Sequence, residues 1–195
     1  MEEVVRPYCT EEICRQWQVT NEEYEELEKE FGLLCYDQGH DLQRKNYRNN
    51  YTDDLDDIVQ FLRMAMLRAA AYTKRQAYIE SCLTAVKKYA TDQFVLGVLF
   101  ELETLWENKT KHGANRQRFG PHQERLLERL VVMTVPSRKR PNRNAKLKIN
   151  MRFRRYCKSV TWNCQKNLGK KITRERAIRA GQVSLSDHDY LSVAM

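Results

Sequence analysis

Residues 53–90, DDLDDIVQFLRMAMLRAAAYTKRQAYIESCLTAVKKYA, decide the class of fold that this chain adopts. Apolar side chains recur there at alternating intervals of three and four residues, the spacing that places them on one face of an α-helix. Thr52 predicts the N-terminal cap, and Lys87 and Lys88 suit the negative end of the helix dipole. Because 38 residues are long for one helix, we expect a break or kink near residues 73–76. The apolar face comprises Leu55, Ile58, Val59, Leu62, Met66, Ala69, Tyr72, Ile79, Cys82, Val86 and Tyr89.

Two further helices are predicted on the N-terminal side of this stretch. Thr10, which two glutamates follow, suits the cap of a short helix. Thr20 and Glu23 have the spacing of a capping box, which predicts the start of a second, acidic helix. Gly39 and the asparagine-rich residues 45–51 are expected to end that helix and to form a connection.

Two helices are also predicted on the C-terminal side. Asp92 suits the cap of the first, and its run FVLGVLF over residues 94–100 is apolar nearly all round, which predicts the central core helix. Pro121 suits the first turn of the second helix, and Pro136 is expected to stop it. Residues 131–135 are compatible with a strand, but no second convincing strand is available to pair with them.

A last helical pattern covers residues 145–168, and Gly169 is expected to cap its C-terminal end. Thr173 predicts the cap of a short helix that Gly181 closes, with a tail after it. The apolar stripe of the longer helix comprises Ile149, Phe153, Cys157, Val160, Cys164 and Leu168. The fold predicted from all these patterns is all-α: a compact helical bundle of about five to seven helices with a basic C-terminal helical extension.

The formal net charge of +8 conceals opposite signs at the two ends of the chain. Residues 1–60 carry 6 basic and 16 acidic side chains (−10), residues 61–135 carry 12 and 7 (+5), and residues 136–195 carry 16 and 3 (+13). Such asymmetry is typical of chains that bind an anionic partner. The predicted segments are an acidic N-terminal helical segment, 1–48, a helical core, 52–135, and a basic linker with a basic amphipathic helix and short tail, 136–195.

Residues 136–171 carry this positive charge most densely, with thirteen lysines or arginines and no acidic residue. On a helix, most of these side chains lie away from the apolar stripe, so the stripe is free to pack on the protein while the basic faces meet phosphates. Tyr156 and Trp162 are interleaved aromatics that can stack on unpaired bases. The predicted nucleic-acid-binding residues are Arg138, Lys139, Arg140, Arg143, Lys146, Lys148, Arg152, Arg154, Arg155, Tyr156, Lys158, Trp162, Lys166, Lys170 and Lys171, with Arg116 and Arg118 as outer contacts.

RNA is favoured over DNA as the partner, because the aromatics suit unpaired bases and no helix-turn-helix or zinc-finger pattern is evident. Arg138, Lys139 and Arg140 follow Ser137 between two prolines and resemble a nuclear localisation signal. This predicts an import receptor as a second partner, and a chain found in the nucleus and the cytoplasm. The expected role is regulatory or structural, such as an RNA-processing factor or a small viral nuclear accessory protein.

The charge pattern leaves other interpretations open. The basic residues can form a solvated face with no ligand, or they can meet an anionic membrane or a protein groove. A different class of function is a self-assembling, matrix-like adaptor, in which acidic and basic segments of different subunits pair to build a homo-oligomer, with an anionic membrane as a further partner. A third interpretation joins the two: the acidic segment masks the basic one until a ligand displaces it.

A zinc site is the one metal site that the cysteines and histidines suggest. Cys9, Cys14, Cys35 and His40 form the pattern C-x4-C…C-x4-H. Structural zinc sites usually pair ligands two to four residues apart, and on a helix the x4 spacing turns two side chains roughly 140° away from each other. The default interpretation is therefore reduced, buried or half-buried thiols, with no metal or cofactor.

No enzyme is predicted. None of the four histidines lies near a Ser or Cys in a recognisable nucleophile motif, and the sequence has no glycine-rich phosphate loop. Residues 53–57 contain an Asp-Asp-x-x-Asp pattern that resembles the magnesium site of isoprenoid synthases, but no second metal motif follows, and helix capping accounts for these aspartates. No secretory signal or membrane span is expected, since the longest apolar run is only residues 94–100.

Overall fold

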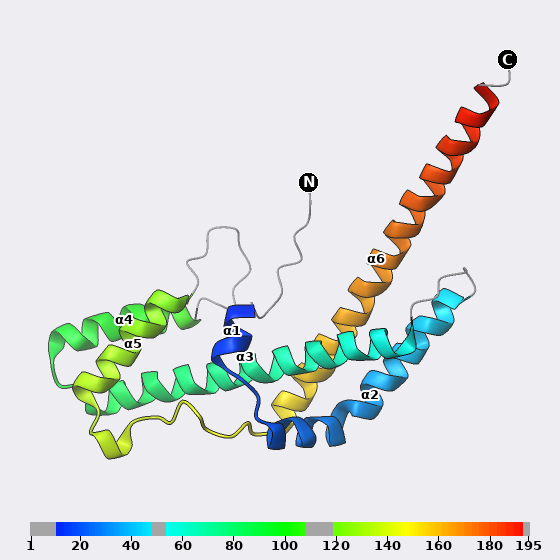
Figure 1. Ribbon diagram of the computed structural model, residues 1–195. Coiled ribbons are helices and arrows are strands. Elements are labelled where there is room, and N and C mark those ends of the chain that lie inside the picture. Colours follow the sequence, from blue (N-terminus) through cyan, green and yellow to red (C-terminus); the bar gives the residue numbers. More distant parts are fainter. Residues whose placement is uncertain (1–10, 48–53, 108–118, 193–195) are drawn as a thin grey trace. The chain divides into compact units, whose positions relative to one another are not determined.

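The computed structural model describes residues 11–47, 54–107 and 119–192, and within them it contains six α-helices, one 3₁₀ turn and no strand (Figure 1). The all-α prediction is therefore confirmed. Residues 131–134, which had a strand as their alternative, belong to a helix. In chain order the elements are α1 (Glu11–Gln16), α2 (Asn21–Tyr47), α3 (Leu55–Tyr89), α4 (Gln93–Glu107), α5 (Pro121–Thr134), η2 (Ser137–Lys139) and α6 (Met151–Ser192).

The chain folds as two units, which are described separately. Unit 1 comprises Met1–Ala71 and Lys148–Met195, and unit 2 comprises Tyr72–Leu147. The predicted segments 1–48, 52–135 and 136–195 follow the charge along the chain and do not coincide with these units, because both the second and the third segment contribute to each unit.

Helix α3 is continuous through residues 73–76, so the predicted break there was wrong. No glycine or proline interrupts the helix, and its apolar stripe supplies buried residues to unit 1 before Ala71 and to unit 2 after Tyr72. The helix is long because it contributes buried residues to the cores of both units. Thr52, the predicted cap, lies outside the described residues. Asp54 precedes the first helical residue, and its carboxylate accepts a hydrogen bond from the backbone N–H of Asp56 at 3.3 Å.

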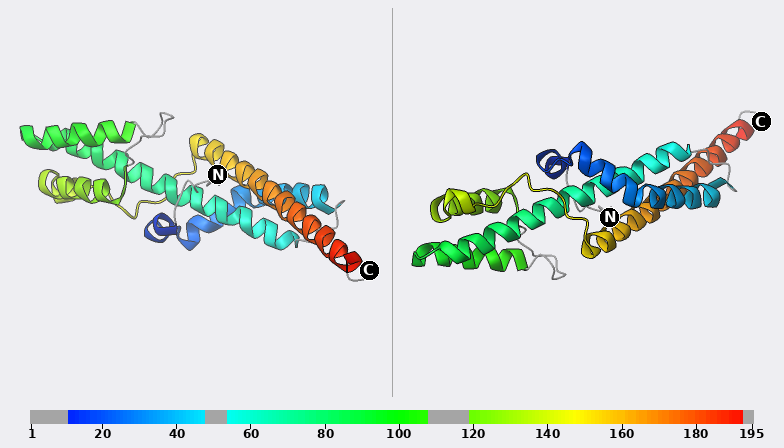
Figure 2. Two further views of the ribbon diagram at one scale, coloured as in Figure 1. Left: turned by 90° about the horizontal axis from the view of Figure 1, so that it is seen from above. Right: turned by 90° about the horizontal axis from the view of Figure 1, so that it is seen from below.

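Unit 1 packs α2 and the first part of α3 with α6, and both views of Figure 2 show α2 and α6 side by side. The predicted capping box opens α2: the Thr20 N–H donates to Glu23 Oε2 at 2.8 Å, and the Glu23 N–H donates to Thr20 Oγ1 at 3.3 Å. The rings of Phe31 and Phe153 meet edge to face, with centroids 5.8 Å apart. A buried cluster consists of Cys35, Leu42, Ile58, Leu62 and Ile172, with Cys164 and Leu168 packed against it.

Helix α2 continues through Gly39 to Tyr47, so the predicted end at Gly39 was wrong. A Cβ at Gly39 would lie 2.8 Å from Val59 Cγ2, closer than real Cβ atoms approach a neighbour. The glycine therefore permits close packing of α2 against α3. A glycine within a helical pattern marks either an end or a close contact, and the linear sequence does not distinguish the two.

Helix α6 begins later and ends later than predicted. It starts at Met151, where Asn150 Oδ1 accepts a hydrogen bond from the Phe153 N–H at 2.9 Å, whereas residue 145 was the expected start. It passes through Gly169, where a Cβ would lie 3.3 Å from Leu42 Cδ1 of α2. Thr173 donates its hydroxyl to the Gly169 carbonyl at 2.9 Å instead of capping a new helix. The predicted separate helix over 173–181 and the predicted tail up to Ser192 are thus part of α6, while residues 193–195 lie outside the described residues.

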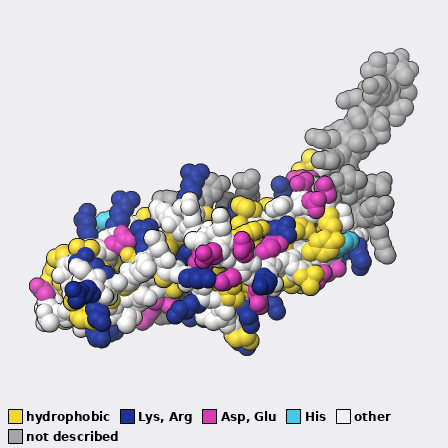
Figure 3. Space-filling model, turned by 60° about the horizontal axis from the view of Figure 1, so that its bottom comes forward, with side chains coloured by type: hydrophobic (Ala, Val, Ile, Leu, Met, Phe, Trp, Pro, Cys, Tyr) yellow, Lys and Arg dark blue, Asp and Glu magenta, His cyan; other side chains and the backbone are white. Residues whose placement is uncertain are grey.

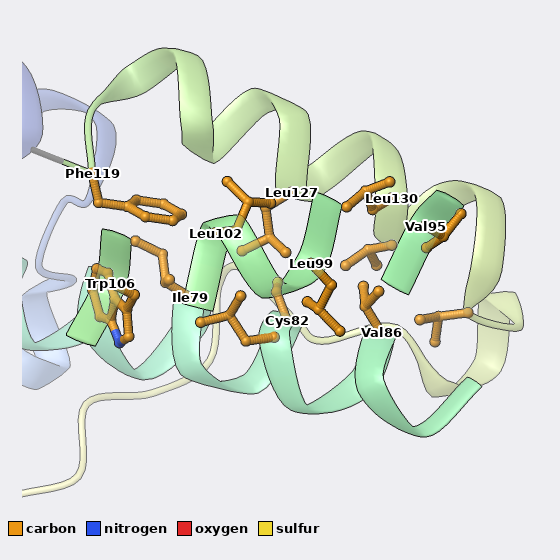
Figure 4. Packing of buried hydrophobic residues seen from close by; sticks show 13 residues of the cluster. Ile79, Cys82, Val86, Val95, Leu99, Leu102, Trp106, Phe119, Leu127 and Leu130 are labelled. Atoms are coloured by element: carbon orange, nitrogen blue, oxygen red, sulfur yellow. The ribbon is translucent and has the colours of Figure 1, made fainter. Parts of the chain in front are cut away.

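Unit 2 packs the second part of α3 with α4 and α5 around one buried cluster, which Figure 4 shows. Asp92 caps α4 as predicted, accepting hydrogen bonds from the N–H groups of Phe94 and Val95 at 2.7 and 3.4 Å. Pro121 occupies the first turn of α5, also as predicted. The cluster comprises Ile79, Cys82, Leu83, Val86, Val95, Leu99, Leu102, Trp106, Phe119, Leu127, Leu130, Val131 and Val135.

The prediction that α4 is a central core helix was wrong. Only one face of α4 is buried, and Phe94 and Phe100 on the other side are 78% and 71% exposed. The apolar side chains of α4 therefore extend beyond the face of the helix that is buried in unit 2. A buried ion pair also stabilises this unit: Arg75 Nε lies 2.9 Å from Glu124 Oε2, and the same guanidinium donates to the Phe119 carbonyl at 3.1 Å. None of the described helices has the length and apolar character that a membrane span requires.

Candidate nucleic-acid interface

The basic residues of unit 1 are positioned by the buried face of α6. Phe153 and Cys157 are buried as predicted, while Val160 and Leu168 are half-buried and Ile149 precedes the helix. Polar residues complete this face: Thr161 and Gln165 are buried, and Gln165 Nε2 donates to the Gln38 carbonyl of α2 at 2.7 Å. That hydrogen bond satisfies a buried amide, and together with the buried Phe153 and Cys157 it orients α6 so that its basic side chains lie away from the core.

The cysteines between α2 and α6 pack in the core of unit 1, and their thiols are poorly suited to act as nucleophiles. Burial raises the pKa of the Cys157 thiol to about 12 and that of Cys35 to about 11, and it also raises the pKa of the half-buried Cys164 to about 11. A thiol with such a pKa carries almost no thiolate at neutral pH, so it reacts and binds metal poorly. The prediction of packed, free thiols is confirmed for these three residues.

The outer face of α6 carries a row of exposed side chains opposite this buried stripe. Arg152, Arg155, Trp162, Lys166 and Lys170 are all exposed and recur at intervals of three, seven and four residues. Because a helix rises about 1.5 Å per residue, the row from residue 152 to residue 170 is roughly 27 Å long. Trp162 is 47% exposed, and Lys166 Nζ lies 5.3 Å from the centroid of its indole ring. We call these five residues the outer row.

Two other predicted residues of α6 are engaged within unit 1. Arg154 forms an ion pair with Glu30 of α2, with Nε 3.0 Å from Oε1, and its second nitrogen donates to Oε2 at 3.2 Å. Lys171 lies 3.7 Å from Glu175, one turn further along the helix. Tyr156 is half-buried and makes contacts of its own, so it is less available for stacking than Trp162. Lys148 and Lys158 are exposed.

The remaining predicted residues belong to unit 2, where two of them support the fold. Arg140 donates to the carbonyls of Val135 and Val132 at 3.1 and 2.9 Å, which satisfies backbone groups at the C-terminal end of α5. Arg143 donates to Glu128 Oε1 at 3.1 Å. Arg138, Lys139 and Lys146 are exposed, the first two on the turn η2.

The structure thus divides the predicted site. Five of its thirteen lysines and arginines lie in unit 2 and eight in unit 1, and only those of α6 form a regular row. On the face drawn in Figure 3, Lys and Arg are interspersed with Asp and Glu, so the charge there is mixed. Arg174 was missed by the sequence reasoning because Gly169 was taken as the helix end. It is exposed one turn beyond Lys170, and a spacing of four within a longer helix was the signal.

The predicted zinc residues do not come together in the described part of the chain. No group of three or more histidine, cysteine or acidic side chains there is arranged to hold a metal ion. Cys35 is fully buried in the core of unit 1, and His40 packs its ring against Tyr36 with centroids 5.2 Å apart. Cys9, like the predicted outer contacts Arg116 and Arg118, lies outside the described residues.

No protein-family model matches this chain, and no curated protein and no solved structure matches it either.

Proposed function

We propose that the chain is a non-enzymatic, nucleic-acid-binding protein that contacts a phosphate backbone, RNA in preference to DNA, through the outer row of α6. The single observation that supports this proposal is the spacing of exposed cations along one face of one helix, with an exposed tryptophan among them. Cations on one face of a helix attract phosphates without the entropy cost of ordering a loop.

The electrostatics of the helix favour the outer row over the rest of the predicted residues. Arg154 is paired with Glu30, so its charge is partly neutralised, whereas Arg152 and Arg155 make no ion pair with the described residues. An arginine without a carboxylate partner retains its full attraction for phosphate. We therefore narrow the proposed contacts to Arg152, Arg155, Lys166 and Lys170, with Lys158 at the edge.

Trp162 supports the preference for unpaired RNA. Its ring is half-exposed at the centre of the row and is bordered by Lys166. Aromatic side chains bind single strands by stacking on bases, which duplexes do not offer because their bases are already stacked. Stacking on one base is worth about 1–3 kcal/mol, so Trp162→Ala is expected to weaken binding to single-stranded RNA by roughly 5- to 150-fold.

A salt titration with single-stranded RNA, duplex RNA and duplex DNA tests the proposal. The double variant Arg152→Ala/Arg155→Ala removes two phosphate contacts, so the slope of log affinity against log salt should flatten by about 1.4 for single strands. Arg154→Ala is the matched control: it lies on the same helix, but its charge is bound to Glu30, and it should change the slope by less.

The outcomes separate the alternatives. An unchanged slope in the double variant would reject the outer row as the site. Binding to anionic vesicles that disappears in this variant, with no RNA binding, would move the function to a membrane surface. Association of the nuclease-treated chain with itself that dissolves at high salt would support the charge-paired assembly instead.

Masking by the acidic segment is best tested at Glu30. Deleting residues 1–48 would remove α2 and with it core residues such as Leu27 and Phe31, so it would disrupt unit 1 instead of unmasking it. Glu30→Gln keeps the fold and releases Arg154. Under masking, this variant should bind RNA more tightly than Glu25→Gln, which removes the same charge from another exposed site of α2.

Nuclear targeting is the second part of the proposal and rests on the exposed turn η2. Arg138 and Lys139 are accessible to an import receptor there, whereas Arg140 is hydrogen-bonded to the end of α5. Arg138→Ala/Lys139→Ala should therefore abolish nuclear accumulation of a fluorescent fusion. A fusion that accumulates in the nucleus in spite of both substitutions would reject this signal.

A further inference from the structure

The outer face of α4 carries two large aromatic side chains that the described residues of unit 2 leave exposed. Its two phenylalanines, Phe94 and Phe100, are 78% and 71% exposed, and Leu96 beside them is 39% exposed. An exposed apolar patch of this kind usually marks an interaction surface, because water contact with large aromatic rings is unfavourable.

Gly97 lies at the centre of this face. With 100° per residue, it points almost opposite to the mean direction of the buried residues Val95, Leu99, Leu102 and Trp106. A Cβ built on Gly97 meets nothing within 4 Å, so no neighbour in the described chain requires a glycine there. Glycine is the poorest helix former apart from proline, and alanine would suit an isolated α4 better. A glycine at such a position permits another backbone to approach closely.

The two exposed phenylalanines are placed symmetrically about Gly97 along the helix. Phe94 and Phe100 each stand three residues from Gly97, so an antiparallel copy of α4, centred on the same glycine, places Phe94 at the level of Phe100 and Gly97 at Gly97. A two-fold axis requires a surface to be self-complementary in this way. The same register sets Gln93 at the level of Glu101, so no acidic side chain stands at the level of that exposed carboxylate.

The geometry points to a homodimer in which α4 packs antiparallel on α4 of a second copy around Gly97. The occupant of this face is thus the chain itself. The charges also agree with such a contact: the two copies of Glu101 would lie roughly 12 Å apart along the axis, eight residues at about 1.5 Å each, so they do not repel at close range. The inference is independent of the proposed nucleic-acid site on α6, because it uses only residues of unit 2.

Sedimentation velocity of the full-length, nuclease-treated chain in about 0.5 M NaCl tests the dimer. Charge-paired association is screened under these conditions, while an apolar contact persists. Wild type is expected to be dimeric, and Phe94→Ser/Phe100→Ser is expected to dimerise at least about tenfold more weakly. Leu33→Ser is the matched control, because Leu33 is 75% exposed on α2 of unit 1 and should leave the dimer unchanged.

Cross-linking tests the two-fold axis. Gly97→Cys brings two thiols face to face, within the separation of about 4.4–6.8 Å between Cα atoms that a disulfide needs. The added side chain weakens the dimer as Gly97→Ala does, but a disulfide traps the pairs of chains that still meet at this position. Thr104→Cys, exposed on the same face, leaves its two copies roughly 21 Å apart. Under mild oxidation Gly97→Cys should form covalent dimers well above the wild-type background, and Thr104→Cys should not.

Three results would overturn the inference: a monomeric wild type, a Phe94→Ser/Phe100→Ser variant as dimeric as wild type, or equal cross-linking at positions 97 and 104. Loss of the dimer in the double serine variant counts in favour only if the variant keeps its helical circular dichroism, which is expected because both side chains are exposed. Gly97→Ala provides a further test, since it should weaken the dimer while leaving the helical content of the monomer intact.

Discussion

At the scale of single residues, Gly39 and Gly97 both lie within a helix but have different roles. Gly39 permits α2 to pack against α3, where a Cβ would lie 2.8 Å from Val59 Cγ2, whereas a Cβ on Gly97 has no neighbour within 4 Å. The sequence around both glycines has the same helical pattern, so it does not distinguish these two roles. The structure is needed to tell a close contact from an exposed site.

The two glycines give a matched pair of predictions. Gly39→Ala should lower the free energy of unfolding by about 1–3 kcal/mol, because Val59 is buried and β-branched and has little freedom to move away. Gly97→Ala should raise it by up to about 1 kcal/mol through helix propensity. Urea denaturation at a protein concentration low enough to keep the chain monomeric measures both. Equal effects of the two substitutions would contradict the packing role of Gly39.

A second prediction at this scale concerns the buried ion pair of unit 2. Arg75 and Glu124 have side chains only 7% and 8% exposed, so Arg75→Ala leaves a carboxylate buried without its partner and should cost about 3–5 kcal/mol. The double variant Arg75→Met/Glu124→Leu should recover most of that loss, since it removes both charges. Lys87→Ala is the surface control: Lys87 lies 3.2 Å from Glu103 but is 66% exposed, and its loss should cost at most about 1 kcal/mol.

At the scale of elements, the starts of α2, α4 and α5 were predictable from the local sequence, whereas the start of α6 and the ends placed at Gly39 and Gly169 were not. Thr20 with Glu23, Asp92 and Pro121 each act on groups within one turn, so their effect is visible in the local sequence. The ends predicted at Gly39 and Gly169 failed because each glycine contacts a different helix, a relation between residues far apart in the chain. The buried stripe of α6 was found by its spacing, but the polar Gln165 within it was not, because its acceptor, the Gln38 carbonyl, belongs to α2.

The packing of α2 against α6 leads to a prediction about pH. Burial raises the pKa of Cys35 to about 11 and that of Cys157 to about 12 from an ordinary value of 9.0. Because the folded state favours the neutral thiol, this contribution to stability is fully present below about pH 9 and is lost as pH rises through the folded-state values. The free energy of unfolding should therefore fall between about pH 9 and pH 12, and less steeply in Cys157→Ala than in wild type.

Urea denaturation at several pH values measures these slopes. Cys157→Ala will also lose some packing energy, but that loss is the same at every pH and so does not alter the comparison. Parallel curves for the two proteins would show that the thiol at position 157 is not protected by the fold.

At the scale of the whole molecule, two cores share one long helix. The buried cluster of unit 2 extends only from Ile79 to Val135, and each of its members lies within Tyr72–Leu147. The predicted segment 52–135 includes every residue of this cluster, but its boundaries differ from those of unit 2. The reason is that the segment was drawn from the charge along the chain, which does not show which residues are in contact.

The self-contained cluster predicts that residues 72–147 fold by themselves. The fragment should show helical circular dichroism and a cooperative thermal transition, because it retains all of its buried apolar contacts and the Arg75–Glu124 pair. Leu99→Ala should abolish the transition or lower the stability by about 2–5 kcal/mol, since Leu99 is 2% exposed. A fragment without a cooperative transition would mean that unit 2 depends on the rest of the chain.

The sequence by itself determined the helical class, the starts of α2, α4 and α5, and the concentration of positive charge after residue 136, because each depends on composition or on neighbours within one or two turns. Only the tertiary structure decided which basic residues remain available. Arg154 is paired with Glu30 of α2, Arg143 is paired with Glu128 of α5, and Arg140 caps α5. Arg152 and Arg155, in contrast, point away from the buried face of α6. The exposure of Phe94 and Phe100 was likewise decided by packing, since an apolar helix buries only as much surface as its neighbours can cover.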